Sequence, residues 1–111
     1  MSPTQRSLAF FKELPGVHAE VVERWIPGAC IRKDYLGIFD LLVLEPGRSG
    51  VTGVQVCARA SAAARRTKMQ ESGYLSLWLQ TGNRALLHSW AKEGPRGTRK
   101  LWRVKVEEVA P

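Results

Sequence analysis

Three residues in the middle of the chain, Asp40, Gln55 and Cys57, have types and spacing that suit chemistry. Asp40 is followed directly by an apolar run over residues 41–44, so a carboxylate stands where a buried strand begins. A carboxylate in that position is normally neutralised, hydrogen-bonded or bound to a cation. Gln55 and Cys57 lie two residues apart, so their side chains point to the same face of a strand. An acid facing a polar pair on the neighbouring strand is the outline of a metal site.

The elements that must position these residues follow from hydrophobic periodicity and from turn residues. Two central strands are expected over residues 38–44 and 51–58, joined by a turn rich in proline and glycine. The other expected elements are a helix over 5–14 capped by Ser2 or Thr4, a strand over 17–25, a loop over 28–37, a helix over 60–73 with Ser61 as a plausible cap, a hairpin of strands over 75–80 and 85–90, a basic loop over 92–100 and a strand over 101–109. This order predicts an α/β fold with a mixed sheet.

Composition indicates one ordinary domain over residues 1–111, because 44% of its residues are hydrophobic and can form a single core. The net charge of +7 favours a polyanionic partner, nucleic acid before membrane. No apolar run approaches the length that crosses a membrane, and the first residues lack the pattern of a secretion signal. Two cysteines are too few for a disulfide framework, so we expect a cytoplasmic protein with reduced thiols.

This order of elements, with Asp40 opening the second strand and Gln55-Val56-Cys57 on the third, resembles the PD-(D/E)XK nuclease superfamily. In that family an Asp opens the second strand and a Glu-x-Lys lies on the third. The resemblance covers roughly residues 5–80 and is strongest to small, phage-borne or Holliday-junction-resolvase-type members. It implies a restriction-endonuclease-like core (α-β-β-β-α-β), with the final hairpin and strand as an addition.

The resemblance also implies a site that holds Mg²⁺ or Mn²⁺ through the side chains of Asp40 and Gln55 and the backbone carbonyl of Val56. Gln55 keeps an oxygen ligand but removes one negative charge, and Cys57 cannot replace the cationic lysine of the motif. The expected replacements for that lysine are Arg59, Lys68 or Lys33. Of the further acid that the family carries on its first helix, the nearest counterpart is Gln5, and Glu13 and Glu23 are less well placed. The resulting catalytic set is Asp40, Gln55, Cys57, Arg59 and Lys68.

Basic residues in three segments are expected to contact nucleic acid: Arg32, Lys33, Arg65, Arg66, Lys68, Arg96, Arg99 and Lys100. Simpler interpretations stand beside these. Asp40 could cap a turn or pair with Arg32, Gln55 could be a core residue with satisfied amide bonds, and Cys57 could be a small packing residue. The basic clusters could be solvated surface, and the tryptophans could be core or interface rather than platforms for bases.

Three functions therefore remain open. The first is a divalent-metal-dependent DNA endonuclease or junction resolvase that hydrolyses phosphodiester bonds. The second is a DNA-binding domain that keeps the nuclease fold but has lost cleavage. The third is a protein-interaction module, for example a phage-encoded inhibitor. By the same resemblance, a symmetric homodimer is the expected state.

Overall fold

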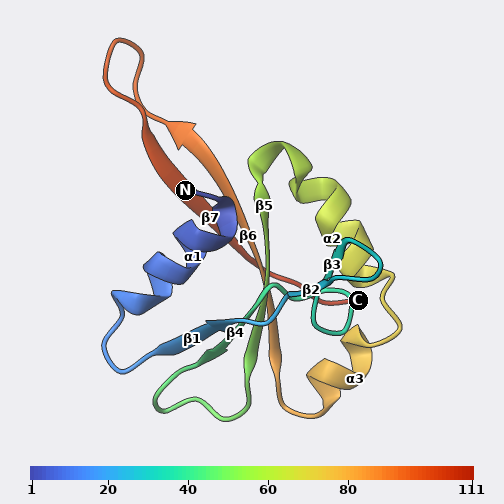
Figure 1. Ribbon diagram of the computed structural model, residues 1–111. Coiled ribbons are helices and arrows are strands. Elements are labelled where there is room, and N and C mark those ends of the chain that lie inside the picture. The colour runs from blue at the N-terminus through green and yellow to red at the C-terminus, as the bar shows by residue number, and fades with distance from the viewer.

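A five-stranded mixed sheet in the order β1-β4-β5-β6-β7 forms the centre of the molecule (Figure 1). The computed structural model describes residues 1–111. The elements are α1 (Pro3–Lys12), β1 (His18–Val21), β2 (Arg24–Ile26), β3 (Ile31–Lys33), β4 (Leu41–Leu44), β5 (Thr52–Ala58), a short 3-10 helix η1 (Arg59–Ser61), α2 (Ala62–Gln70), α3 (Leu75–Gln80), β6 (Arg84–Glu93) and β7 (Leu101–Glu108). Neighbouring strands of the sheet are antiparallel except β5 and β6, which are parallel. The predicted α/β fold with a mixed sheet is confirmed.

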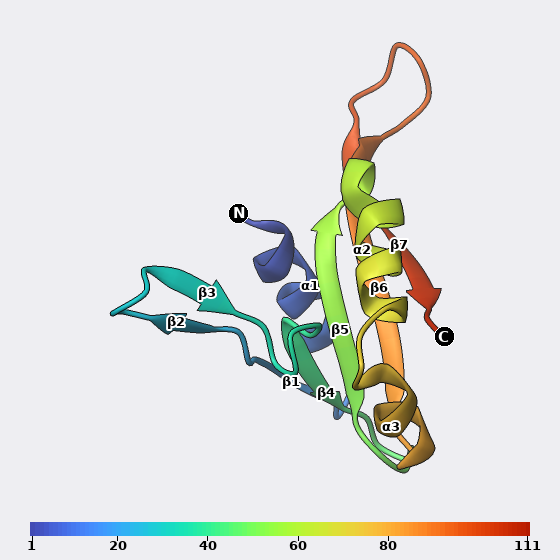
Figure 2. The ribbon, with the colours of Figure 1, turned by 90° about the vertical axis from the view of Figure 1, so that its right-hand side faces the viewer.

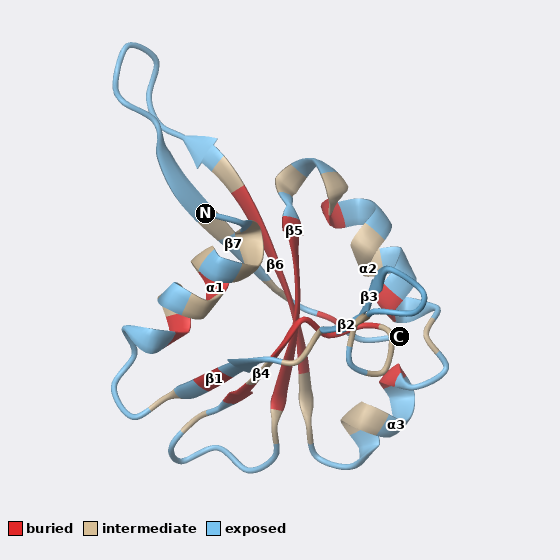
Figure 3. Cartoon of the chain, viewed as in Figure 1, coloured by how far each residue is buried: buried red, intermediate tan, exposed pale blue.

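Helices cover both faces of this sheet, so its central strands are buried on either side (Figures 2 and 3). On one face, Phe11 of α1 packs on a buried set that includes Leu41, Val43 and Val54. On the other face, Met69 of α2 and Leu75 of α3 pack with a second set, which contains Phe39 and Leu87. Such two-sided burial explains why β5 reads as a nearly continuous apolar run. No helix is long and apolar enough to cross a membrane.

The first helix begins as predicted at a serine cap. The Ser2 side chain accepts a hydrogen bond from the backbone N–H of Gln5 at 3.2 Å, and Pro3 occupies the first turn, where no N–H is needed. A buried polar contact then ties this helix to β6. The indole N–H of Trp90 donates to Ser7 Oγ at 2.8 Å, and Ser7 Oγ lies 2.9 Å from His88 Nδ1.

The expectation of a strand over residues 75–80 is wrong, because this segment is helix α3. Leu75, Trp78 and Leu79 face the core, and that spacing suits a helix as well as the leucine alternation suits a strand. The sheet decides between them, because β6 is paired by β5 on one side and by β7 on the other and leaves no free edge for a strand over 75–80. The predicted hairpin between 75–80 and 85–90 is therefore also absent, and residues 81–83 instead link α3 to β6.

The segment between residues 17 and 40 also differs from expectation. The single strand predicted over 17–25 is two strands, β1 and β2, and the predicted loop over 28–37 contains β3, which pairs with β2 in a separate hairpin. The predicted strand over 38–44 begins only at Leu41, because Leu36 and Gly37 have positive φ angles of 56° and 75° and turn the chain tightly before it. The strand over 51–58 and the C-terminal strand are confirmed within one residue at each end.

Candidate functional site

Asp40 lies where β4 and β5 part. Its backbone N–H donates to Val54 O at 2.8 Å, and the last paired residues of the two strands are Leu41 and Val54. Beyond that point β5 continues to Ala58 with a strand on one side only. The carboxylate of Asp40 fills the gap, because Oδ2 accepts hydrogen bonds from the Val56 N–H at 2.7 Å and from Gln55 Nε2 at 2.8 Å.

Close packing of the preceding residue fixes this position. The ring of Phe39 lies directly on β5 over Gly53, where an added Cβ would meet ring carbons at 2.7 Å. Phe39 is fully buried and its ring also lies 4.8 Å, centroid to centroid, from that of Trp78 on α3. Only glycine at position 53 leaves room for this ring, so the backbone of Asp40 is held against β5.

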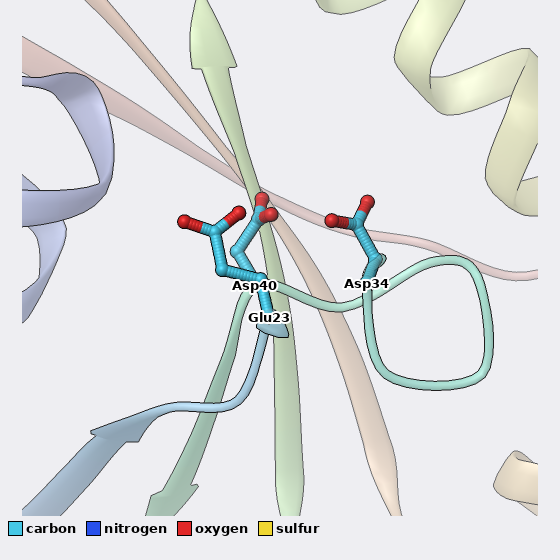
Figure 4. Close-up of side chains that lie close together, drawn as sticks. All are labelled: Glu23, Asp34 and Asp40. Atoms are coloured by element: carbon cyan, nitrogen blue, oxygen red, sulfur yellow. The ribbon is translucent and has the colours of Figure 1, made fainter. Parts of the chain in front are cut away.

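Two further carboxylates join Asp40 in a cluster, those of Glu23 and Asp34 (Figure 4). The three residues each offer an oxygen, and these oxygens lie within 4.8 Å of one another. Glu23 immediately precedes β2 and Asp34 immediately follows β3, so the pairing of these two strands brings both acids back to Asp40. We call Glu23, Asp34 and Asp40 the acidic cluster.

The electrostatics of the acidic cluster disfavour three negative charges. Burial of Asp40, opposed by its hydrogen bond from Val56 and reinforced by Asp34 and Glu23, raises the pKa of Asp40 from 3.8 to about 8. At neutral pH the carboxyl of Asp40 therefore carries a proton. A divalent cation between the three side chains would favour the ionised form and displace that proton.

Two cations at the rim balance the other acids. Arg32 Nη1 lies 3.2 Å from Glu23 Oε1, and Lys68 Nζ of α2 lies 3.6 Å from Asp34 Oδ2. Glu23 and Asp34 are largely covered, with 15% and 16% of their side chains exposed, whereas Arg32 and Lys68 are well exposed. The side chains of Arg32 and Lys68 can therefore reorient to bind an anion from solvent without disturbing the fold.

The acidic cluster lines a cleft of about 310 Å³ between the start of α1 and the start of α2. Gln55 belongs to its wall, is 1% exposed, and its Oε1 accepts no hydrogen bond although its amide nitrogen is bound to Asp40. An unpaired buried acceptor is costly, and a cation in the cleft would satisfy it. The lining residues are Pro3, Thr4, Glu23, Asp34, Asp40, Gln55, Val56, Cys57, Ala58, Ser61 and Arg65.

Several of the residues singled out in the sequence therefore meet here. Asp40, Gln55, Val56, Cys57 and Arg65 all line this cleft, and Lys68 reaches its rim through Asp34. The simpler interpretation of Cys57 is supported, because it packs in the core beneath α2 and burial raises the pKa of its thiol. The alternative pairing of Asp40 with Arg32 is not found, since Arg32 binds Glu23.

Two of the predicted basic residues form contacts with β6 and β7 outside the cleft. Arg59, considered as a replacement for the missing lysine, hydrogen-bonds Ser89 and the carbonyl of Arg103 and forms an ion pair with Glu93. It therefore fastens η1 to β6 and β7 rather than lining the cleft. Arg66 is held by Glu107 of β7 at 2.6 Å, which lowers the pKa of that carboxyl.

The remaining basic residues lie away from the cleft wall. Arg96, Arg99 and Lys100 are exposed in the connection between β6 and β7, which extends beyond the sheet (Figure 1). Lys33 is exposed at the end of β3, next to Asp34. The basic loop therefore extends away from the sheet, whereas Lys33 is next in sequence to a member of the acidic cluster.

Sequence reasoning missed Glu23 and Asp34 as members of the site. Glu23 was considered only as a less well placed counterpart of the acid that the family carries on its first helix, and Asp34 lay in the expected loop over 28–37 with no role assigned to it. The sequence signal that indicates them is Pro27-Gly28, a turn pair with a short segment of apolar and basic residues on either side. A hairpin closing at that turn brings positions 23 and 34 together.

No protein-family model, curated protein or solved structure matches this chain. The class of protein is therefore defined by its own fold and site. It is an α/β domain with a carboxylate cluster in a cleft at the point where two central strands separate.

Proposed function

We propose that this protein is a divalent-metal-dependent nuclease that hydrolyses phosphodiester bonds of DNA. The observation that carries the proposal is the acidic cluster, whose oxygens lie within 4.8 Å of one another in a chain with a net charge of +7. Arg32 and Lys68 pair with two of these carboxylates and a proton neutralises the third, so a divalent cation would replace that proton and be held by all three side chains. The surrounding positive charge suits a polyanionic substrate.

The residues present fit Mg²⁺ or Mn²⁺. Both ions take oxygen ligands, and both are held in proteins by a few carboxylates with substrate phosphate and water completing the shell. Asp40, Glu23 and Asp34 would supply the carboxylates, and the unpaired Oε1 of Gln55 a neutral ligand. Glu23 and Asp34 thereby restore the negative charge that glutamine at position 55 lacks.

A bound ion of this kind supplies a nucleophilic water at neutral pH and neutralises charge on the phosphate. The chain's own residues orient and support that chemistry. Val56 N–H and Gln55 Nε2 hold Asp40 in one rotamer. Lys68 and Arg65 lie at the rim and in the wall of the cleft, where they would contact phosphate oxygens and stabilise charge that builds up there. Lys68 is the residue we assign to the role of the missing motif lysine.

We further infer that the core is of the PD-(D/E)XK type. This inference is supported by the order α1-β1-β4-β5-α2-β6, by Asp40 at the start of β4 and by Gln55-Val56-Cys57 in β5. On this view the β2–β3 hairpin, α3 and β7 are additions to the core. A symmetric homodimer also remains a proposal, to be tested by sedimentation equilibrium.

A DNA-binding domain without cleavage is the second candidate. It is favoured by Cys57, which carries no charge and packs in the core at the position of the motif lysine. For the protein to be a nuclease, Lys68 must supply the positive charge of the motif lysine from helix α2 rather than from β5. The two candidates share the DNA-binding surface and differ only in turnover.

The test is cleavage of linear, flapped and four-way-junction DNA in Mg²⁺ and in Mn²⁺ by wild type, Asp40→Asn and Glu20→Gln. Glu20 is an exposed carboxylate on β1 outside the cleft, so its variant is a matched control for loss of one charge. We expect cleavage by wild type and Glu20→Gln and none by Asp40→Asn. Salt-sensitive binding without cleavage in either metal would establish the second candidate instead.

Metal binding can be measured separately from cleavage. Thermal unfolding in Mn²⁺ and in a chelator should show a higher midpoint with the metal for wild type, because an ion that binds only the folded state stabilises it by ~3 kcal/mol at 100 times its dissociation constant. The shift should disappear in Asp40→Asn. An equal shift in both proteins would place the ion elsewhere and defeat the assignment of the acidic cluster.

A further inference from the structure

The hairpin of β2 and β3, residues 24–33, stands away from the rest of the molecule. Its two strands pair only with each other, and Figure 2 shows them extending beyond α1, away from the sheet. Only Ile26 among its strand residues is even partly buried. An isolated two-stranded hairpin is marginally stable in water, and this one contributes almost nothing to either core. We call residues 24–33 the arm.

The exposed surface of the arm is apolar and positively charged. Trp25 is 54% exposed and Ile31 52% exposed, so the short arm presents two large apolar side chains to solvent. The arm carries Arg24, Arg32 and Lys33 and contains no Asp or Glu. Charge and apolar surface together are the combination that nucleic-acid-binding surfaces present.

The register of the arm places two like charges opposite each other. Arg24 pairs directly with Lys33, and Trp25 pairs with Arg32 on the other face. Like charges in a cross-strand pair destabilise a hairpin unless an anion lies near both. Arg24 and Lys33 line one surface pocket together with Asp34, so two positive charges face a single carboxylate there, and the remaining positive charge suits a further anion such as phosphate.

The ends of the arm are the acidic cluster. Glu23 is the residue before Arg24, and Asp34 is the residue after Lys33. Anything that the arm grips is consequently held next to the proposed metal site. A cation bound by Glu23 and Asp34 would also join the two ends of the arm.

From these observations we propose that the arm is a two-stranded ribbon that enters the major groove of duplex DNA and sets the phosphate backbone over the acidic cluster. The inference rests on the proposed function and deepens it, because it names duplex DNA as the substrate. A major groove of B-form DNA is ~12 Å wide and ~8.5 Å deep and admits a two-stranded ribbon. At about 3.3 Å per residue, the three residues of each strand span about 10 Å, which exceeds the depth of the groove even without the turn over residues 27–30.

Both faces of a ribbon in that groove contact DNA. The pair Arg24 and Lys33 lies on one face, and the pair Trp25 and Arg32 lies on the other. Arg24 and Lys33 contact phosphates, and Trp25 contacts base edges or thymine methyl groups. The major groove of duplex RNA is deep and narrow and excludes such a ribbon. Duplex DNA is therefore preferred over duplex RNA of the same sequence.

The test measures binding of one sequence as duplex DNA, single-stranded DNA and duplex RNA, by fluorescence anisotropy in a chelator so that no cleavage occurs. The proteins are wild type, the double variant Arg24→Ala/Lys33→Ala, and Lys12→Ala/Arg48→Ala. The last removes the same charge from exposed positions outside the arm, where Arg48 pairs only with nearby Glu45. Thermal midpoints close to wild type in both double variants show that the fold is intact.

We expect the arm variant to bind duplex DNA at least ~10-fold more weakly, and the salt dependence of log K to fall by about 2, since each phosphate contact contributes about 0.9. The control variant should change the slope by less than about 1. Trp25→Ala should weaken binding and leave the slope unchanged.

Four results would overturn the inference: an arm variant that matches wild type or the control, tighter arm-dependent binding of single-stranded DNA, tighter arm-dependent binding of duplex RNA, or no nucleic-acid binding by wild type. The last result would turn attention to an acidic protein partner for the arm. Failure of the arm and failure of the nuclease remain distinguishable. Cleavage that depends on Asp40 but not on the arm would refute only the proposed role of the arm. Arm-dependent binding of duplex DNA without cleavage in any metal would refute only the proposed nuclease activity.

Discussion

Replacing Asp40 with asparagine should make the folded protein more stable at neutral pH, which is unusual for a buried residue with two hydrogen bonds. The asparagine carbonyl can accept from Val56 N–H and Gln55 Nε2 as Asp40 Oδ2 does. Its amide then faces Glu23 and Asp34 and can donate to them. The variant thus resembles the protonated form of Asp40 without the cost of protonation.

The size of the effect follows from the pKa of Asp40, raised from 3.8 to about 8 mainly by burial. A group whose folded pKa is raised is ionised in the unfolded chain but protonated in the folded one between those two values. Stability is therefore lost as pH rises from about 4 to about 8, by about a tenfold change in the folding constant per pH unit. At pH 7 this amounts to about 4 kcal/mol, a large share of a small domain's stability.

The assay is urea unfolding of wild type, Asp40→Asn and Glu20→Gln at several pH values between 4 and 8, in a chelator, followed by tryptophan fluorescence. We expect the stability of Asp40→Asn to equal that of wild type near pH 4 and to exceed it progressively at higher pH. Glu20→Gln should follow wild type throughout, because Glu20 is exposed. Addition of Mn²⁺ should narrow the difference by stabilising wild type only.

A difference between wild type and Asp40→Asn that stays constant across this pH range would refute the reasoning. So would an asparagine variant that is less stable than wild type at pH 8. Either result would mean that Asp40 is ionised in the folded protein and serves as a structural acceptor for β5. The acidic cluster would then be compatible with the molecule's own stability and would need no cation.

Three further predictions follow from packing and charge. Burial of His88 lowers the pKa of its imidazole from 6.5 to about 4, so the free energy of unfolding should fall by about 3 kcal/mol as pH drops through that interval. Urea unfolding of Asp40→Asn, in which residue 40 no longer titrates, measures this fall. Equal free energies of unfolding at the two ends of the interval would contradict the burial of a neutral ring. Gly53→Ala should cost about 1–3 kcal/mol by pushing Phe39 off β5, and an unaltered melting midpoint would disprove that contact. Lys68→Ala should reduce cleavage ~100-fold or more while changing stability by less than ~1 kcal/mol, and equal losses in Lys12→Ala would remove Lys68 from the mechanism.

The local pattern was sufficient for some of the fold. Ser2-Pro3 predicts where α1 begins, and the apolar run around Gln55 predicts β5, because cap chemistry and strand burial are read directly from neighbouring residues. Asp40 and Gln55 were expected to lie together for the same reason, since a short turn joins their strands. The hydrogen bond between them agrees with that expectation.

The helix over residues 75–80 and the carboxylates that surround Asp40 depended on contacts between distant parts of the chain. The leucine alternation of residues 75–80 fits strand and helix equally, and the segment is a helix because β5 and β7 already occupy both edges of β6. Glu23 and Asp34 are eleven residues apart in the chain and meet only because β2 pairs with β3. The sequence by itself determined the fold class, the principal strand and the acid at its edge. Only the tertiary structure decided which charges surround that acid, because electrostatic energy depends on distance through space.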